Sequence, residues 1–281
     1  MKKLTVAFSI VLIVMLIVGS VLGVKVYKHE KWQSGQIHNL SAQVRELQET
    51  NDSLVEQISA MQDEIDKLQG KVEYSDTAFN YLAIGNSITL HGLADYWWNE
   101  IGMAATTADN DYVHLVSDYL EETYGEVCFY AMNYFKWETQ SHDRAETYET
   151  IDPYLSNKLD LITVQLSENV SDTTTFESDF EALLKYLSQK APNAKILVIG
   201  DFWDSGEKEA AKRAATEKFG VQYISLDEIK GNPEYQCGIG TTVYDKEGRP
   251  HVVEHNGVAG HPGDKGMRYI ADKIIEGLKS E

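Results

Sequence analysis

The sequence predicts an α/β fold with a doubly wound, mainly parallel sheet, preceded by a transmembrane helix and a coiled coil. Three observations support this order of parts. An apolar run covers Leu4–Val24, and a heptad repeat covers Ile37–Val72. From residue 79 to the C-terminus, short apolar segments alternate with amphipathic ones, a pattern typical of a parallel sheet covered by helices. The chain therefore divides into regions 4–24, 37–72 and 79–281.

The first region predicts a membrane anchor. Leu4–Val24 contains no charged residue and is long enough to span a bilayer as a helix. A cleaved signal peptide is the alternative, because Gly19-Ser20 and Leu22-Gly23 offer small residues. We favour the uncleaved anchor because the run is long and a helical stalk follows it. Lysines flank both ends, so the positive-inside rule does not decide the topology. The very short N-terminal tail suggests a single-pass protein with its N-terminus inside and its folded domain extracytoplasmic.

The second region predicts a parallel coiled-coil stalk that forms a homodimer. The a positions are Ile37, Val44, Asn51, Ile58, Ile65 and Val72, and the d positions are Leu40, Leu47, Leu54, Met61 and Leu68. β-Branched residues at a with leucine at d favour two strands, and a single a-position asparagine such as Asn51 fixes the register. The alternative is a lone amphipathic helix packed on the domain. The e and g positions are mostly glutamine, which favours self-association over charge-selected partners.

Composition excludes several classes of partner and cofactor. The net charge is -19, which argues against binding to nucleic acid and against electrostatic docking on anionic lipid. The two cysteines, Cys128 and Cys237, have no zinc or redox spacing, so they form one disulfide or remain two free thiols. His251 and His255 are four residues apart but not on a convincing helix. The sequence therefore predicts neither a metal nor a cofactor.

Apolar segments bounded by polar turns predict the strands of the third region. We expect strands at Tyr81–Ile84, Val127–Met132, Leu159–Leu166, Lys195–Gly200 and Val221–Ser225. We expect helices near Tyr112–Tyr124, Arg144–Leu155, Phe176–Gln189, Glu207–Phe219 and Asp264–Leu278. A β-hairpin is expected where Thr242-Val243-Tyr244 and His251-Val252-Val253 flank a polar turn.

Residues with catalytic potential follow these strands. Ser87 follows the first strand, Asn133 ends the second, and Ser167-Glu168-Asn169 follows the third. His261 lies just before the last helix. The carboxyl ends of parallel strands meet at one edge of a sheet, so we expect these residues to gather there. A serine hydroxyl needs a histidine base to become a good nucleophile, and the sequence therefore points to acyl transfer.

These residues, in this order, resemble the SGNH/GDSL hydrolase family from about Phe79 to the C-terminus. Gly85-Asn86-Ser87 matches the first block, Gly-Asp-Ser, and Ser167-Glu168-Asn169 matches the third, Gly-x-Asn. The fifth block, Asp-x-x-His, is matched only at His261. The resemblance implies a flavodoxin-like three-layer fold. It also implies that Ser87 is the nucleophile and His261 the base, with the Ser87 backbone N–H and the Asn169 amide stabilising the oxyanion.

The sequence departs from the family at the triad acid. Val258 stands three residues before the histidine, where the family has an aspartate. Asp264, Glu254 and Asp245 are nearby candidates for the acid, and a backbone carbonyl could orient the imidazole instead. Asp264 is also expected to cap the last helix.

Three further departures concern the oxyanion site. The second-block glycine is missing, and Trp137 or Glu138 occupies its neighbourhood. Ser167 replaces the third-block glycine, and Asn86 replaces the aspartate beside the nucleophile. A backbone N–H exists on any residue except proline, so an oxyanion donor can survive without the glycine.

Seven further side chains are candidates for the oxyanion site or the substrate cleft. They are Asn86, Asn133, Trp137, Glu138, Glu168, Trp97 and Trp98. Exposed tryptophans beside a site can stack on sugar rings. Packing in the core, or in a dimer contact, is the alternative for Trp97 and Trp98.

Together these features predict a membrane-anchored serine esterase or O-acyltransferase. The expected substrate is an ester of an extracellular glycan, with an O-acetyl ester the simplest choice, and a small diffusible ester is an alternative. A second hypothesis is a catalytically impaired module that binds a glycan or a protein, because the acid and a glycine are missing. A third is an interaction protein that recruits partners through its coiled coil.

Overall fold

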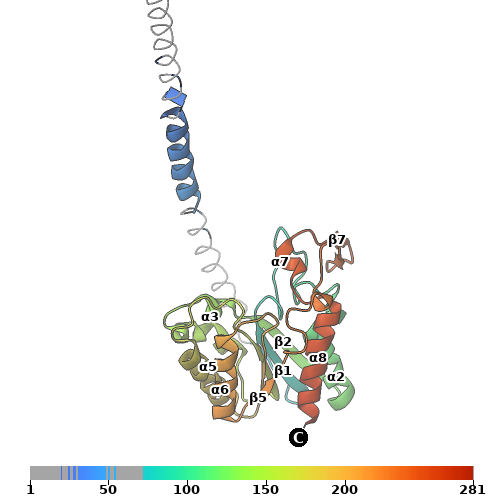
Figure 1. Cartoon of the computed structure of the whole chain (residues 1–281). Helices are drawn as coiled ribbons and strands as arrows, with labels where there is room; N and C mark the ends of the chain where they lie inside the picture. The colour runs from blue at the N-terminus through green and yellow to red at the C-terminus, as the bar shows by residue number, and fades with distance from the viewer. Residues whose placement is uncertain are drawn as a thin grey trace, which may run out of the picture. The chain divides into compact units, whose positions relative to one another are not determined.

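A computed structural model describes residues 31–48 and 72–280, together with residues 20, 25, 28–29, 50 and 54. The chain forms two compact units, Met1–Gln69 and Gly70–Glu281 (Figure 1). The predicted anchor Leu4–Val24 lies outside the described residues except for Ser20. Within the part of the chain that is described, no helix is long and apolar enough to cross a membrane.

The described part of the first unit is helical. Residues 31–48 form a continuous stretch of helix, and the seam side chains Ile37, Leu40, Val44 and Leu47 are all more than half exposed in the single chain. An exposed apolar seam of this kind is what a coiled coil covers with its partner. Most of the repeat beyond residue 48 lies outside the described residues, so the pairing of two stalks stays a prediction.

The second unit is built on a parallel sheet of five strands in the order β2-β1-β3-β4-β5. The strands are β1 (Phe79–Gly85), β2 (Val127–Asn133), β3 (Leu161–Gln165), β4 (Lys195–Ile199) and β5 (Gln222–Ile224). All four pairings are parallel, with Gly85 opposite both Asn133 and Gln165. This order is flavodoxin-like, and it places the topological switch point between β1 and β3. The predicted doubly wound sheet is therefore confirmed.

Helices cover both faces of this sheet (Figure 1). The longer ones are α2 (Tyr112–Tyr124), α5 (Phe176–Lys190), α6 (Glu207–Phe219) and α8 (Asp264–Lys279). Alternate residues of β1 point to opposite faces, as the period of a strand requires. Tyr81 and Ala83 pack with α2 and α8, whereas Leu82 and Ile84 pack with α5. Each face thus has its own apolar core, which makes the unit self-contained.

Short helices fill the connections where the prediction was least accurate. They are η1 (Ala108–Asn110), α3 (Phe135–Thr139), η2 (Arg144–Thr147), α4 (Tyr148–Ile151), η3 (Asp152–Tyr154), η4 (Pro233–Tyr235) and α7 (Asn256–Ala259). The single helix expected at Arg144–Leu155 was wrong, because this stretch is η2, α4 and η3 in succession. Pro153 lies in η3 and has no N–H for a continuing α-helix. The helix α3 was not predicted.

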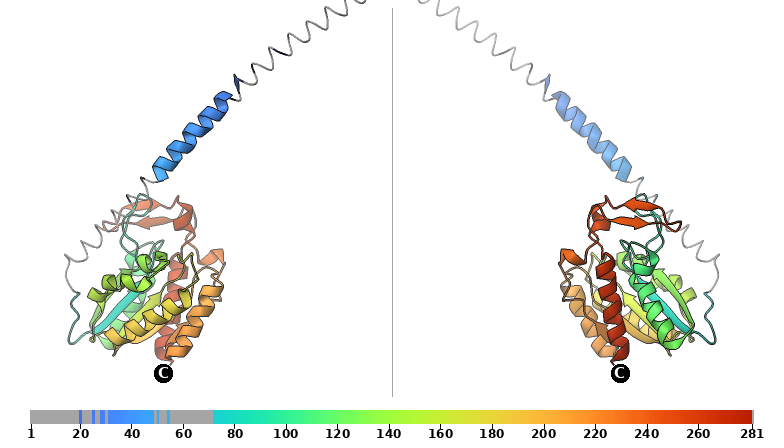
Figure 2. Two further views of the ribbon diagram at one scale, coloured as in Figure 1. Left: turned by 90° about the vertical axis from the view of Figure 1, so that its left-hand side faces the viewer. Right: turned by 90° about the vertical axis from the view of Figure 1, so that its right-hand side faces the viewer.

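The predicted hairpin is present. β6 (Thr242–Tyr244) and β7 (Pro250–Val252) pair antiparallel, and α7 follows them. The two turned views place this hairpin at the end of the domain opposite the C-terminus (Figure 2). Cys128 and Cys237 are both unbonded, so of the two alternatives the free thiols are observed.

Candidate active site

The turn after β1 presents Ser87. Gly85 must be glycine here, because a Cβ at this position would lie 1.8 Å from Thr89 Oγ1. The Asn86 carbonyl accepts hydrogen bonds from the N–H groups of Thr89 and Leu90, both at 3.0 Å. The Ser87 carbonyl accepts from Met103 N at 2.8 Å, so the turn is tied on both sides. These bonds fix the hydroxyl of Ser87 at the carboxyl end of the sheet.

His261 reaches this hydroxyl from the loop between α7 and α8. Ser87 Oγ lies 2.8 Å from His261 Nε2. The other ring nitrogen, Nδ1, lies 2.6 Å from the carbonyl oxygen of Gly257. A carbonyl only accepts, so Nδ1 carries the proton and Nε2 is free to accept from the serine. This is the tautomer that a general base requires.

Burial lowers the pKa of His261 to about 4, with smaller contributions from the nearby imidazoles of His91 and His255. The hydrogen bond to the Gly257 carbonyl acts in the opposite direction. The imidazole is therefore neutral at neutral pH and available as a base.

The triad acid is replaced by a backbone carbonyl. Both nitrogens of His261 are occupied, by Ser87 and by Gly257, so none of the three candidate carboxylates orients the ring. Asp264 accepts from Thr106 N at 2.8 Å, and Asp245 pairs with Arg249 and His251.

Two expectations about single residues of this loop can be settled. Asp264 does not cap the final helix α8: it is the first helical residue, and Gly263 is the N-cap. Val258 is buried in the apolar core, which explains why this position carries no carboxylate.

A cluster of amides and carboxylates lies beside the nucleophile. Asn86 Nδ2 donates to Glu138 Oε1 at 3.1 Å and to Glu168 Oε2 at 2.8 Å, while Asn86 Oδ1 accepts from Ile88 N at 3.1 Å. Asparagine, with two N–H donors, fits between two glutamates, whereas the aspartate of the family would add a third carboxylate. The departure at residue 86 is thus explained by Glu138 and Glu168.

Asn169 joins this cluster from the turn after β3. Its Nδ2 donates to Glu138 Oε2 at 2.7 Å, and its side chain is exposed. An amide nitrogen has two hydrogens, so one donor remains for a ligand. Through Glu138, the amide is linked to Asn86, the residue next to the nucleophile. Asn169 therefore remains the candidate oxyanion donor.

The two glutamates are hard to ionise together. Burial raises the pKa of Glu168 to about 8, and the charges of Asp201 and Glu138 add to the effect, although Lys212 opposes it. Burial also raises the pKa of Glu138, against the effect of the donors from Asn169, Ser167 and Asn86. We therefore expect Glu168 to hold its proton at neutral pH.

Replacing Glu168 by glutamine is expected to flatten the pH dependence of stability. The folded pKa of about 8 lies above the ordinary value of 4.5, so between these values the folded state binds more protons than the unfolded state. The free energy of unfolding of the natural protein should therefore fall as pH rises through this window. The loss should be smaller in Glu168→Gln by roughly 1–2 kcal/mol, or a few degrees in Tm. Thermal unfolding across the window measures it, and equal slopes would contradict the assignment.

Several predicted lining residues lie elsewhere than expected. Trp97 and Trp137 are buried and cannot stack on a substrate. Trp137 packs edge-to-face on Phe176 and Phe180, with ring centroids 6.1 and 6.0 Å away. For Trp97, the alternative of core packing is what the structure contains.

Trp137 also cannot supply the oxyanion donor of the missing second-block glycine. Its backbone N–H donates to Tyr134 O at 3.0 Å.

Asn133 joins two segments of the chain, and the second hydrogen of its amide is left for a ligand. Its Nδ2 donates to Leu90 O at 2.7 Å, and its Oδ1 accepts from Phe135 N at 2.9 Å. These bonds join the end of β2 to the turn that carries Ser87. Asn133 thus has a structural role, and its expected lining role stays a prediction.

Sequence reasoning missed two residues that contact the histidine. Gly257 contributes only a carbonyl, for which side-chain patterns give no signal. Trp203 packs edge-on against His261, with ring centroids 5.0 Å apart, and its Nε1 donates to Gly260 O at 3.2 Å. Its place shortly after β4 was the available signal, because that strand also ends at the active edge.

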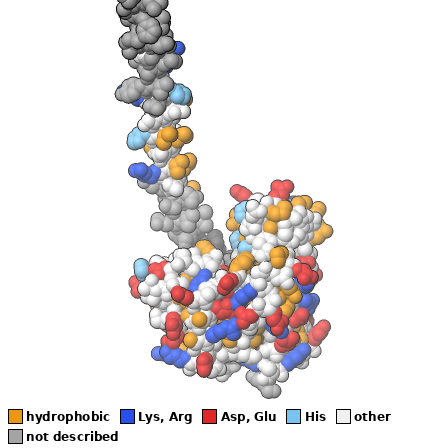
Figure 3. Space-filling view, in the orientation of Figure 1, with side chains coloured by type: hydrophobic (Ala, Val, Ile, Leu, Met, Phe, Trp, Pro, Cys, Tyr) orange, Lys and Arg blue, Asp and Glu red, His pale blue; other side chains and the backbone are white. Residues whose placement is uncertain are grey.

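Aromatic and imidazole rings pair between the loop after β1 and the region of the β6–β7 hairpin. Tyr96 stacks on His255 at 4.7 Å between centroids and lies 6.0 Å from His91. Trp98 stacks on His251 at 4.5 Å, so of the two tryptophans it is the one near the surface. On the face drawn in Figure 3, acidic and basic side chains are interspersed over the domain, and no basic patch gathers there.

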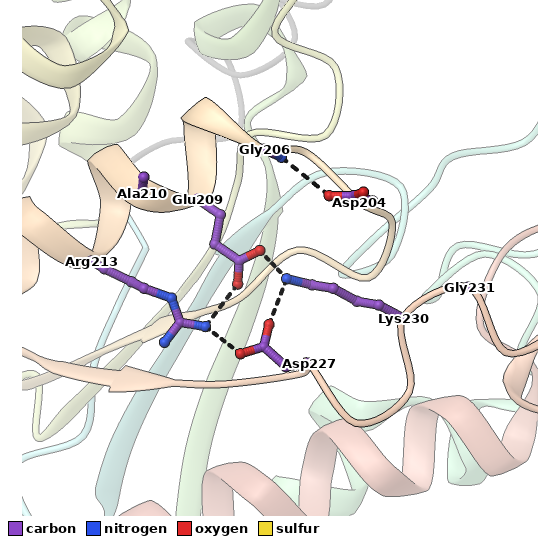
Figure 4. Close-up of a pocket in the computed structure, with 8 residues that line it drawn as sticks. All are labelled: Asp204, Gly206, Glu209, Ala210, Arg213, Asp227, Lys230 and Gly231. Atoms are coloured by element: carbon purple, nitrogen blue, oxygen red, sulfur yellow. Dashed lines mark hydrogen bonds and ion pairs between the residues drawn. The ribbon is translucent and has the colours of Figure 1, made fainter.

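A hollow of about 670 Å³ lies between α6 and the segment after β5. Figure 4 shows four of its charged side chains forming a closed ring, in which Arg213 and Lys230 each pair with Glu209 and Asp227, while Asp204 accepts from Gly206 N. The four charges of the ring neutralise one another, so the ring ties α6 to the segment after β5. This hollow is therefore not a candidate active site. Among the residues that the structure describes, no group of three potential metal ligands occurs.

The chain is similar to a number of solved structures. No protein-family model and no curated protein matches the chain. Similar solved structures include a two-domain esterase active on acetylated mannans, 18% identical with a TM-score of 0.45, for which the match covers 73% of this chain and 50% of that one. Another is described as a GDSL-like lipase from Parabacteroides merdae, 16% identical with a TM-score of 0.47 and coverages of 74% and 100%.

A third similar structure is the esterase EstA of Pseudoalteromonas sp., inhibited by monoethylphosphonate, at 14% identity, a TM-score of 0.45 and coverages of 71% and 96%. The chain spans half the length of the mannan esterase. Two of these structures are described as esterases and one as a GDSL-like lipase. Because the identities and TM-scores are low, we base the chemistry on the geometry of the site.

Proposed function

We propose that residues 79–281 are a serine esterase of the SGNH/GDSL type that acts through an acyl-serine. One observation carries this proposal. Ser87 Oγ lies 2.8 Å from His261 Nε2, while Nδ1 of the same ring donates to Gly257 O at 2.6 Å. The dyad is thus connected, and its base is in the required tautomer.

The reaction follows from this arrangement. As Ser87 Oγ attacks the acyl carbon, its proton passes to His261 Nε2, and the free N–H of Asn169 and the Ser87 N–H stabilise the oxyanion. The imidazolium then returns the proton to the leaving alkoxide, leaving an acyl-serine. Water, or a sugar hydroxyl, attacks this ester while His261 takes its proton, and the imidazolium returns that proton to Ser87 Oγ as the acyl–serine bond breaks. The first acceptor makes the protein an esterase and the second an O-acyltransferase.

We propose an O-acetyl ester of an extracellular glycan as the substrate. The predicted anchor and stalk favour a substrate at the cell surface rather than within the bilayer. Tyr96 is partly exposed and, stacked on His255, offers an aromatic face near His261. A membrane-bound parallel homodimer with extracytoplasmic domains remains part of this proposal.

The alternative is a binding module of the same fold. The missing carboxylate favours it, because a carbonyl stabilises an imidazolium less than an anion does. The two functions differ in whether Ser87 reacts.

Covalent labelling decides between them. The full-length chain in a non-ester detergent is treated with a 4-nitrophenyl ethylphosphonate ester. We expect stoichiometric release of 4-nitrophenol and a phosphonate adduct on the peptide that contains Ser87. Ser87→Ala should remain unlabelled, whereas Ser178→Ala, which removes an exposed serine of α5, should react normally. A folded natural protein without an adduct would support the binding module.

A further inference from the structure

A buried lysine and aspartate lie beneath the proposed active site without a part in its chemistry. Lys212 and Asp201 are both fully buried, and Lys212 Nζ lies 2.5 Å from Asp201 Oδ1. Burial would raise the pKa of Asp201, but the charge of Lys212 holds it below its ordinary value. A buried ion pair contributes little net stability compared with apolar residues of similar volume. Its contacts point to a different role.

Both charges hold one residue in an unusual backbone conformation. Ser167 has a φ of 126°, in the region that favours glycine, and is completely buried. Such a conformation persists only where the surroundings enforce it. Ser167 Oγ donates to Asp201 Oδ1 at 2.6 Å, and Lys212 Nζ donates to the carbonyl of Leu166 at 2.7 Å. The side chain of Ser167 and the peptide before it are thus held together.

Ser167 in turn connects to the oxyanion side of the site. Its backbone N–H donates to Glu138 Oε1 at 2.6 Å, and Glu138 Oε2 accepts from Asn169 at 2.7 Å. A rotation at Ser167 would move its N–H away from Glu138 and shift the turn that carries Asn169.

The helix that supplies the lysine is itself fixed at both sides. Lys208, one turn before Lys212 on α6, donates to the carbonyls of Glu168 at 3.3 Å and Val170 at 3.1 Å. The ring of ion pairs around Arg213 ties α6 to the segment after β5 (Figure 4). The helix is therefore a rigid support for the turn after β3.

We propose that Lys212 and Asp201 are positioning residues: they clamp Ser167 at a positive φ and thereby set Asn169 for oxyanion stabilisation. This inference rests on the proposed esterase function and names the residues that keep its oxyanion donor in place. Neither residue touches the substrate or the reacting atoms.

The test first neutralises Lys212 and Asp201 and then replaces Ser167 by glycine, which does not need to be held at a positive φ. Because a single unpaired buried charge could unfold the protein, the pair is neutralised together as Lys212→Met with Asp201→Asn. We expect kcat for 4-nitrophenyl acetate to fall roughly 100-fold in the full-length chain, as a misplacement near 1 Å can cause, with KM little changed. Adding Ser167→Gly should restore kcat to within about 3-fold of Ser167→Gly alone, because glycine adopts this φ without strain.

Controls separate the possible failures. Lys218→Met removes a lysine from the same helix, where it pairs with Glu181 at the surface, and should leave kcat unchanged. The proposal is contradicted if Ser167→Gly does not restore kcat of the neutralised variant. It is also contradicted if the neutralised variant is fully active, or if it is unfolded both with and without Ser167→Gly. If the natural protein is inactive and not labelled at Ser87, the proposed function fails instead.

Discussion

Replacing His261 by alanine is expected to lower kcat/KM for 4-nitrophenyl acetate at least about 10³-fold while the domain stays folded. The imidazole is the only base within hydrogen-bond distance of Ser87 Oγ among the contacts of the described residues, at 2.8 Å. Without it the hydroxyl keeps its proton and attacks poorly. Initial rates and intrinsic tryptophan fluorescence, measured on the same samples, give activity and folding.

The same imidazole should set the acid limb of the pH profile. Its pKa is lowered to about 4 by burial, so kcat/KM of the natural protein should rise with pH and level off above about pH 5. An imidazole at its ordinary value of 6.5 would place the inflection more than two pH units higher. An inflection near 6.5 would contradict the lowering of this pKa by burial, and His261→Ala with the activity of the natural protein would contradict its role as the base.

The layout of the sheet could be predicted because its strands are continuous apolar runs. Leu82 and Ile84 face one core while Tyr81 and Ala83 face the other, so β1 is apolar on both faces and stands out in the sequence. The position of Ser87 followed from the rule that parallel strands end at one edge of a sheet.

The environment of the site could not be predicted in the same way. Glu138 comes from α3, a five-residue helix with too few residues for a periodic signal. Its partner Asn86 lies 52 residues away in the chain. Trp137 next to it resembles a stacking residue in sequence, and only the packing of Phe176 and Phe180 reveals it as core.

Restoring the family's aspartate by Asn86→Asp is expected to destabilise this protein. Asn86 Nδ2 donates to Glu138 at 3.1 Å and to Glu168 at 2.8 Å, and an aspartate would oppose both with a third carboxylate oxygen. Leaving buried acceptors without donors and adding a like charge should cost on the order of 3 kcal/mol near pH 8. The loss should be smaller near pH 5, where the glutamates hold their protons more easily. Urea unfolding at both pH values measures it.

The double variant Asn86→Asp with Glu168→Gln supplies the decisive control. It exchanges donor and acceptor across the same contact, because the glutamine Nε2 can take the place of Glu168 Oε2 and donate to the new aspartate. The remaining oxygen can still accept from Phe202 N, which lies 3.2 Å from Glu168 Oε1. We expect the double variant to regain at least about half of the loss, a coupling that a double-mutant cycle measures directly. Additive losses of stability would mean that Glu138 and Glu168 do not determine why residue 86 is asparagine. The absence of the family's aspartate would then have a reason outside this network.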